Sequence, residues 1–358
     1  MTAGSVPESD VLPIVRPPSR EGDNKKGPLA RPESTLLAEA KFVNHLNRAR
    51  TKRQLAPQST IKLGSPIVAP ETESEIRVGT SAFTAAGWEG MFYPAGMQPR
   101  DFLTYYATKF NTVEVDSTFY RTPARSTIIG WANKTPPGFV FALKIPQVIT
   151  HEKCLEDCDE EFKTFIDTAE GLGKEKLGPM LLQFPYFNRA KFKTGAEFLA
   201  RLRPFLKKLP KGHQFALEIR NKNWLDEKFT EILREHNVAL AVIDQAWMPG
   251  ITELTSRLDP ITSNFTYVRW LGDRKGIEEQ TKVWNRTIVD RRAALSGWVD
   301  YCYQTTRRGI KVYAYANNHY AGHAPATVAL FLELWEKQKK IPDAACTRGC
   351  DLSNIVKE

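Results

Sequence analysis

Short apolar runs alternate with amphipathic segments along most of this chain, from residue 76 onward. Runs of β-branched and apolar residues predict eight strands, at 76–82, 112–117, 139–146, 177–184, 214–219, 238–243, 265–271 and 310–316. Helical spacing predicts helices from Pro99 and at 124–134, 159–172, 195–208, 225–236, 281–308 and 323–339. Strands that mostly alternate with helices in this number fit a (β/α)8 TIM barrel of the α/β class better than an open doubly wound sheet.

The residues outside this pattern differ in composition. Residues 1–34 are rich in Pro, Ser, Glu and Lys and contain no aromatic residue, so we expect disorder there. A helix is expected near 35–55; its basic end is a candidate contact for nucleic acid or lipid, although we favour a solvated helix. The expected organisation is an N-terminal extension at 1–75, a barrel domain at 76–340 and a polar tail at 341–358.

Composition narrows the class of protein. No apolar run is long enough to span a bilayer, and the N-terminus lacks the pattern of a secretory signal. Five scattered cysteines favour free thiols over a disulfide framework, and we therefore expect a cytoplasmic protein. The net charge of +9 favours anionic partners, either a small molecule or nucleic acid. No strand is followed by a GxGxxG or GxxxxGK[ST] motif, which argues against the usual nucleotide-binding loops.

Polar and ionisable residues fall at the carboxyl ends of the predicted strands, where TIM barrels carry their active sites. Period two directs these side chains into that end of the barrel: Thr80, Ser81, Glu114, Asp116, Lys144, Gln183, Glu218, Arg220, Asp244, Tyr267, Arg269, Tyr313, Tyr315 and Asn317. Four loop residues join them as candidates: Tyr120, His151, Trp224 and Asn318. A register error of one residue would turn any strand residue outward.

Several sequence blocks occur in an order that carries a family resemblance: VGTSAFTAAGWEGMFYP, FNTVEVDSTFYRTP, FALKIP, LGPMLLQFP, LEIRNKNW, YVRWLG and YAYANNHYAGHAP. Together they resemble the YecE-like family, also called domain of unknown function family 72, over about residues 76–338. The resemblance implies a TIM barrel. It does not imply an activity, because none is established for the family. A relation to TIM-barrel endonucleases and DNA binding have both been proposed for it.

Two kinds of chemistry fit these residues. In the first, Lys144, Arg220 and Arg269 bind a phosphate or carboxylate, while Glu114 or Glu218 transfers a proton. The amides of Asn317 and Asn318 would then orient the substrate. In the second, four carboxylates bind a divalent metal with His151 or His319 nearby: Glu114, Asp116, Glu218 and Asp244. We do not favour the metal, because the three cations would repel it.

A third interpretation is structural, since the same acids and bases could simply pair as buried salt bridges. We expect an enzyme, hydrolase-like in character, that acts on an anionic and phosphate-containing substrate. The alternative is a non-catalytic nucleic-acid-binding protein that uses its basic surface. The expected catalytic residues are Glu114, Asp116, Lys144, Glu218 and Asp244. The expected substrate-binding residues are Thr80, Ser81, Tyr120, His151, Gln183, Arg220, Trp224, Arg269, Tyr315, Asn317 and Asn318.

Overall fold

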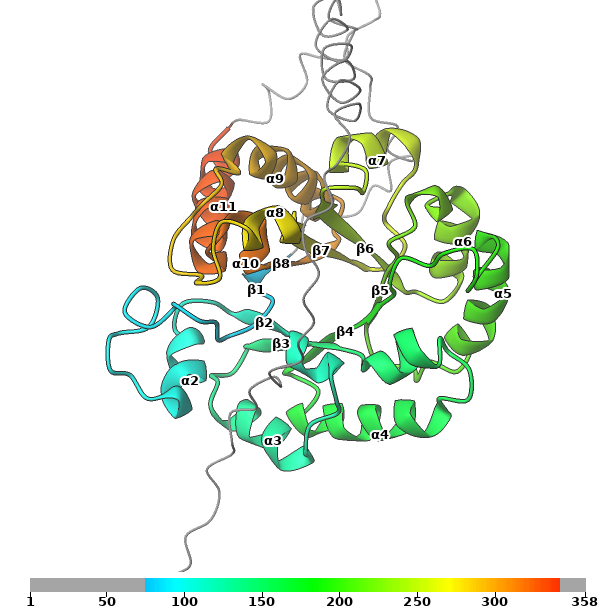
Figure 1. Cartoon of the computed structure of the whole chain (residues 1–358), viewed down its shortest axis with the longest axis horizontal. Coiled ribbons are helices and arrows are strands. Elements are labelled where there is room, and N and C mark those ends of the chain that lie inside the picture. The colour runs from blue at the N-terminus through cyan, green and yellow to red at the C-terminus, as the bar shows by residue number, and fades with distance from the viewer. Residues whose placement is uncertain (1–74, 342–358) are drawn as a thin grey trace, which may run out of the picture. The chain divides into compact units, whose positions relative to one another are not determined.

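The computed structural model describes residues 75–341, and the expected disorder, the 35–55 helix and residues 342–358 of the polar tail lie outside them. Eight parallel strands lie side by side in a ring with helices outside it (Figure 1). They are β1 (Ile76–Thr80), β2 (Thr112–Val115), β3 (Val140–Lys144), β4 (Leu177–Gln183), β5 (Phe215–Glu218), β6 (Ala239–Gln245), β7 (Phe265–Gly272) and β8 (Lys311–Ala316). The predicted TIM barrel is confirmed.

The helices cover the outside of the barrel and carry its connections. They are α2 (Phe102–Tyr106), α3 (Arg125–Asn133), α4 (Asp159–Ala169), α5 (Gly195–Leu206), α6 (Glu227–Glu235), α7 (Ile251–Arg257), α8 (Arg274–Glu278), α9 (Arg292–Arg307), α10 (Asn318–Ala321) and α11 (Ala324–Lys339). Side chains cap several of them: the Asp226 carboxylate accepts from the Phe229 N–H at the start of α6.

One helix boundary from the sequence is wrong. The predicted helix at 281–308 begins only at Arg292, and residues 281–291 form an irregular segment. Two of its backbone N–H groups bond to distant parts of the chain: the Trp284 N–H donates to the Ala86 carbonyl, and the Ile288 N–H donates to the Ala321 carbonyl at the end of α10. Tertiary contacts therefore outweigh the local helical pattern.

The barrel closes between β1 and β2 at a seam that carries no backbone ladder of its own. At Gly79 the two strands approach so closely that a β-carbon would lie 2.1 Å from the Thr112 carbonyl oxygen. The Tyr106 hydroxyl bridges the seam, because it accepts from the Thr80 N–H at 2.9 Å and donates to the Thr112 carbonyl at 3.1 Å. A buried side chain thus supplies hydrogen bonds that a ladder would otherwise provide.

Inside the ring, small and large side chains complement one another. Alanines from β3, β5 and β6 face tyrosines and a phenylalanine from β7 and β8: Ala142, Ala216, Ala239, Ala241, Phe265, Tyr267, Tyr313 and Tyr315. The opposite faces of the strands pack against the helices in a separate core. Above the tyrosine layer, at the carboxyl ends of the strands, the interior becomes charged. We call this end the barrel mouth. Within residues 75–341, no helix has the length and apolar character to cross a membrane.

Candidate active site

Arg269 lies at the centre of the barrel mouth. Its guanidinium donates to both oxygens of Glu114 at 2.8–3.1 Å, to Glu218 Oε2 at 2.7 Å and to Asp116 Oδ1 at 3.2 Å. Arg269 belongs to β7, and its partners come from β2, β5 and the 3₁₀ turn that follows β2. The predicted side-chain directions at Glu114, Glu218 and Arg269 therefore bring these groups together. Since all three nitrogens of its guanidinium bond carboxylates, the Arg269 side chain is fixed in place and forms the floor of the barrel mouth.

Glu114 is fully buried beneath this guanidinium. Burial raises the pKa of its carboxyl, and the facing Arg269 charge opposes that shift. The Tyr267 hydroxyl donates to Glu114 Oε2 at 2.6 Å, so both carboxylate oxygens accept hydrogen bonds. These hydrogen bonds oppose the rise in the pKa of Glu114, and they hold its carboxyl group in place against Arg269.

Glu218 joins the floor to one wall of the mouth. Its carboxylate accepts from Arg269 and from the Arg220 Nε, while a second Arg220 nitrogen donates to Gln245 Oε1. Burial alone would raise the pKa of Glu218, but the two guanidinium groups bring it down to about 2. Glu218 is consequently a permanent anion that orients Arg220, and it is a poor proton donor at neutral pH.

Lys144 differs from these paired groups. Its ammonium lies 3.7 Å from Asp116 Oδ1 and 3.9 Å from the centre of the Phe119 ring. Nowhere in the described part of the chain does this ammonium find a hydrogen-bond acceptor. The side chain is 11% exposed, and burial lowers the pKa of the amine. A buried cation with free N–H donors is prepared for an anionic ligand.

The backbone around Lys144 is fixed by Thr118. Its hydroxyl lies 2.7 Å from the Lys144 carbonyl, 2.9 Å from the Val115 carbonyl and 3.0 Å from the Lys144 N–H. Here the chain has already left β2 and entered the 3₁₀ turn Asp116–Phe119. The turn therefore keeps Asp116 over the mouth, although the strand that predicted its direction ends at Val115.

These groups surround a pocket of about 450 Å³, a size that suits a small molecule. We call it the mouth pocket. Its lining is mostly polar and comes from nearly every connection at this end of the barrel: Asp116, Phe119, Tyr120, Lys144, Gln147, His151, Gln183, Arg220, Gln245, Arg269, Leu271, Arg274, Asn317 and His319.

His151 reaches the mouth pocket from a single turn of π-helix, Val148–Glu152. Such turns are rare and occur often at functional sites. Burial, followed by the charges of Lys144 and Arg220, lowers the pKa of His151 to about 4. The imidazole is therefore neutral at pH 7. The Thr150 hydroxyl bonds its Nδ1 at 2.8 Å, which leaves Nε2 for a ligand.

A second histidine, His319, also lines the mouth pocket and takes part in a chain of hydrogen bonds. Its Nδ1 bonds Asn317 Oδ1 at 2.6 Å, and its Nε2 bonds Glu278 Oε1 at 2.8 Å. The Asn317 amide in turn donates to the Ser81 hydroxyl at 2.9 Å. Ser81 and Asn317 thus lie together at this end of the barrel, and Asn317 lines the mouth pocket.

Several predicted site residues lie elsewhere. Asp244 points out of the barrel, where its Oδ2 accepts from the Trp298 indole at 2.8 Å and the Tyr320 hydroxyl at 2.9 Å. Thr80 also faces outward and bonds the Tyr106 hydroxyl. The structure corrects these two predictions. The side chains that point inward lie one residue further along the chain, at Gln245 on β6 and at Ser81 after β1.

Three more placements are corrected. Tyr315 lies one layer below the mouth, where its hydroxyl bonds the Thr112 hydroxyl. The Asn318 amide oxygen accepts from the Trp88 indole and from the Ala324 N–H, so this side chain fastens loops together. Trp224 packs on Phe198 beside a different pocket.

The sequence interpretation missed three polar residues of the pocket, Gln147, Gln245 and Arg274. A signal for Gln245 was present in the β6 sequence ALAVIDQ. The small residues Ala239 and Ala241 fit the narrow interior, whereas Leu240 and Val242 fit the helix-facing side. Continuing that alternation places Gln245 inside and Asp244 outside.

The donor groups in the mouth do not form a metal-binding set. In residues 75–341, no three His, Cys, Asp or Glu side chains come together in a group that could hold a metal ion. The carboxylates of Glu114, Glu218 and Asp116 do converge, and the Arg269 guanidinium occupies the space between them. That cation takes the role that a metal would have there.

Comparison of the chain with known proteins identifies its family. A family described as "Protein of unknown function DUF72" matches residues 77–348. The UPF0759 protein YunF of Bacillus subtilis is 28% identical over 201 residues, which cover 53% of this chain and 69% of YunF. The UPF0759 protein YecE of Escherichia coli K12 is 32% identical over 119 residues, 33% of this chain. That match spans 41% of YecE, less than half of its length.

Solved structures agree with the sequence relatives. The crystal structure of a DUF72 family protein from Thermotoga maritima has a TM-score of 0.57 at 27% identity and covers 74% of this chain and 99% of that one. A DUF72 family protein from Enterococcus faecalis has a TM-score of 0.52 at 19% identity over 75% of this chain and 99% of that one, and shares the fold. The resemblance of the sequence blocks is confirmed, and the chain belongs to the DUF72 family of proteins of unknown function.

Proposed function

We propose that the mouth pocket is the active site of an enzyme that acts on a phosphate-containing substrate. The observation that carries this proposal is the Lys144 ammonium, which is buried, lines the pocket and makes no hydrogen bond within residues 75–341. A bound phosphate oxygen would supply the missing hydrogen-bond acceptor, beside the Asp116 carboxylate that already faces this ammonium at 3.7 Å. Arg220 lines the same pocket, is already oriented by Glu218 and Gln245, and would bind a second oxygen.

His151 is the group best suited to move a proton in this pocket. Its imidazole is neutral, and Nε2 is free of protein partners in the described part of the chain. It would accept a proton from an attacking water or substrate hydroxyl. A bound phosphate would place negative charge beside it and offset the Lys144 and Arg220 charges that lower its pKa.

Asp116 is the carboxylate most open to a substrate. Its side chain is 30% exposed, whereas those of Glu114 and Glu218 are fully buried. Only Oδ1 of Asp116 bonds Arg269, so Oδ2 remains available to accept from a substrate hydroxyl or a water. We therefore assign the reacting roles to Lys144, Asp116 and His151, and supporting roles to Glu114, Glu218 and Arg269.

A ³¹P NMR experiment with pooled phosphorylated metabolites tests this function. We expect the protein to convert at least one compound, and His151→Asn to lower turnover roughly 10²–10⁴-fold while the compound still binds. Lys144→Met is expected to weaken binding itself. Turnover that is unaffected by either substitution would place the reaction outside the mouth pocket.

A further inference from the structure

Next to the mouth pocket lies a second pocket of about 450 Å³ with a different lining. It is formed by the loops after β4, β5 and β6, and its charged lining residues are Arg189, Lys193, Arg220 and Lys222. We call it the side groove. Arg220 lines both pockets, so the groove adjoins the mouth at this residue.

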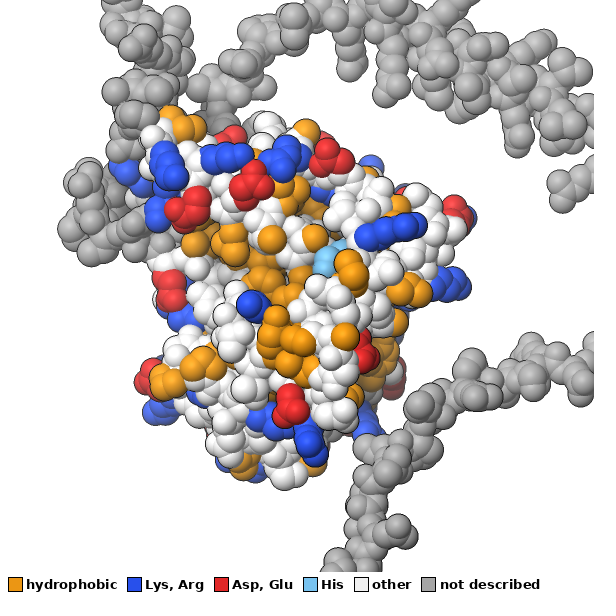
Figure 2. Space-filling view, turned by 90° about the vertical axis from the view of Figure 1, so that its left-hand side faces the viewer, with side chains coloured by type: hydrophobic (Ala, Val, Ile, Leu, Met, Phe, Trp, Pro, Cys, Tyr) orange, Lys and Arg blue, Asp and Glu red, His pale blue; other side chains and the backbone are white. Residues whose placement is uncertain are grey.

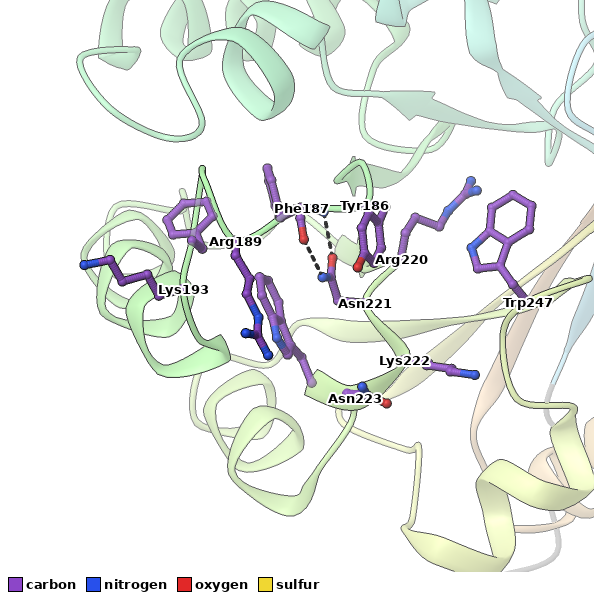
Figure 3. A pocket seen from close by; sticks show the side chains of 11 residues that line it. Tyr186, Phe187, Arg189, Lys193, Arg220, Asn221, Lys222, Asn223 and Trp247 are labelled. Carbon is purple, nitrogen blue, oxygen red and sulfur yellow. Dashed lines mark hydrogen bonds between the residues drawn. The ribbon is translucent and has the colours of Figure 1, made fainter.

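The side groove contains only positive charge. Four of its lining residues are cations and none is acidic (Figure 3). Three of them, Arg189, Lys193 and Lys222, form no salt bridge with any residue between 75 and 341. Elsewhere the surface is mixed: the face in Figure 2 carries acidic and basic side chains interspersed around an apolar centre. Unpaired cations gathered along one groove favour a ligand with several negative charges.

Aromatic side chains accompany these cations. Tyr186 and Trp247 line the groove and are 67% and 49% exposed. Tyr120, at the mouth, is 73% exposed, and these are the only three exposed aromatic side chains of residues 75–341. Figure 3 shows the Arg220 side chain directed toward the Trp247 ring. Exposed rings beside cations are the arrangement that stacks on bases and binds the adjoining phosphates.

The side groove is preorganised by contacts within the protein. The Asn221 amide donates to the Phe187 carbonyl and accepts from the Phe187 N–H, both at 2.9 Å, which ties the loop after β4 to the loop after β5 (Figure 3). Trp224 stacks on Phe187 and Phe198 beneath these loops. A fixed floor lowers the entropy that a ligand must overcome on binding.

We propose that the side groove binds single-stranded nucleic acid and delivers its terminal phosphate to the mouth pocket. Phosphates would contact Arg189, Lys193 and Lys222, and unpaired bases would stack on Tyr186 and Trp247. Stacking requires bases that are not paired in a duplex, so the strand is single. The delivery to Lys144 rests on the proposed function of the mouth, whereas binding in the groove stands without it.

Fluorescence anisotropy with labelled octathymidylate tests the groove. The double variant Tyr186→Ala/Trp247→Ala is expected to weaken octathymidylate binding tenfold or more, because each stacked base contributes substantially to the binding free energy. Its affinity for inorganic polyphosphate is expected to stay within about twofold of the wild type. Arg189→Gln/Lys193→Gln/Lys222→Gln is expected to weaken both ligands and to flatten the salt dependence by about 2 in log–log slope. Lys207→Gln, an exposed lysine at the opposite end of the barrel, is the matched control.

The outcomes separate the two proposals. Unchanged octathymidylate affinity in the aromatic variant, or equal affinity for a duplex of the same length, would overturn the groove as a single-strand site. A 5′-phosphate on the oligonucleotide is expected to strengthen binding, and Lys144→Met to remove that gain. If Lys144→Met keeps the gain while the groove variants behave as expected, the mouth proposal fails and the groove proposal stands.

Discussion

One guanidinium, that of Arg269, holds both oxygens of the Glu114 carboxylate at the floor of the barrel mouth. The pair joins β7 to β2 across the barrel interior and is fully enclosed. Because the same guanidinium also bonds Glu218, this one cation links side chains of three strands, β2, β5 and β7. A network of this kind fixes the site geometry, but it leaves a buried charge behind when one partner is removed.

We therefore expect Arg269→Met to cost about 3–5 kcal/mol in the free energy of unfolding, because two buried carboxylates lose their partner. Urea unfolding followed by circular dichroism measures this loss. Arg274→Met is the control: Arg274 pairs with Glu278 at an exposed site, and its loss is expected to cost no more than about 1 kcal/mol. Adding Glu114→Gln to Arg269→Met should restore part of the stability. A single variant as stable as its control would show that the network is dispensable.

The seam between β1 and β2 gives a second prediction. Tyr106→Phe removes the hydroxyl that bridges Thr80 and Thr112, and we expect a loss of about 1–3 kcal/mol because buried backbone groups lose their partner. Tyr105→Phe is the matched control, since its hydroxyl makes no hydrogen bond within residues 75–341. Equal unfolding midpoints for the two variants would mean that the seam does not need the bridge.

The pH dependence of His151 gives a third prediction. Its pKa of about 4 lies below the ordinary value of 6.5, so the unfolded chain binds this proton first. The associated stability is complete above pH 6.5 and is lost as the pH falls toward 4. We expect the His151 ring resonance to titrate near pH 4, and at higher pH in Lys144→Met or with phosphate bound. A midpoint near 6.5 in the unligated protein would contradict the described environment.

Two adjacent residues on β6 give a fourth prediction. Gln245→Ala is expected to weaken phosphate binding because it frees Arg220, with little effect on folding. Asp244→Ala is expected to do the reverse: it leaves the Trp298 and Tyr320 donors unpaired, at a cost of about 1–3 kcal/mol, and leaves binding unchanged. Calorimetric titration and urea unfolding of both variants measure the contrast. Weakened binding in Asp244→Ala alone would reverse this assignment.

Much of the fold was predictable from sequence because barrel strands are buried on both faces and stand out as apolar runs. All eight strands lie where the apolar runs placed them, and the inward positions of Glu114, Lys144, Glu218 and Arg269 followed from period two. Whether a side chain points into the barrel or out of it could not be predicted where the end of a strand could not be located. On β6 a shift of one residue exchanged Asp244 for Gln245.

The ion pairs of the barrel mouth were harder to predict than the positions of the residues that form them. The sequence shows that Arg269 and Glu114 face the same mouth, but not that the guanidinium is fully used by carboxylates while Lys144 keeps free donors. That distinction depends on distances between strands far apart in the chain. The side groove was missed for the same reason, since its cations and exposed rings come from three separate loops.

Calorimetric titration with inorganic phosphate tests whether Lys144 binds the phosphate of the substrate. We expect saturable binding to the wild-type protein and a loss of tenfold or more in affinity in Lys144→Met, which removes a charge-assisted hydrogen bond. Lys207→Met should bind phosphate as the wild type does. Equal phosphate affinity in the wild type and in a folded Lys144→Met variant would show that Lys144 does not bind the phosphate.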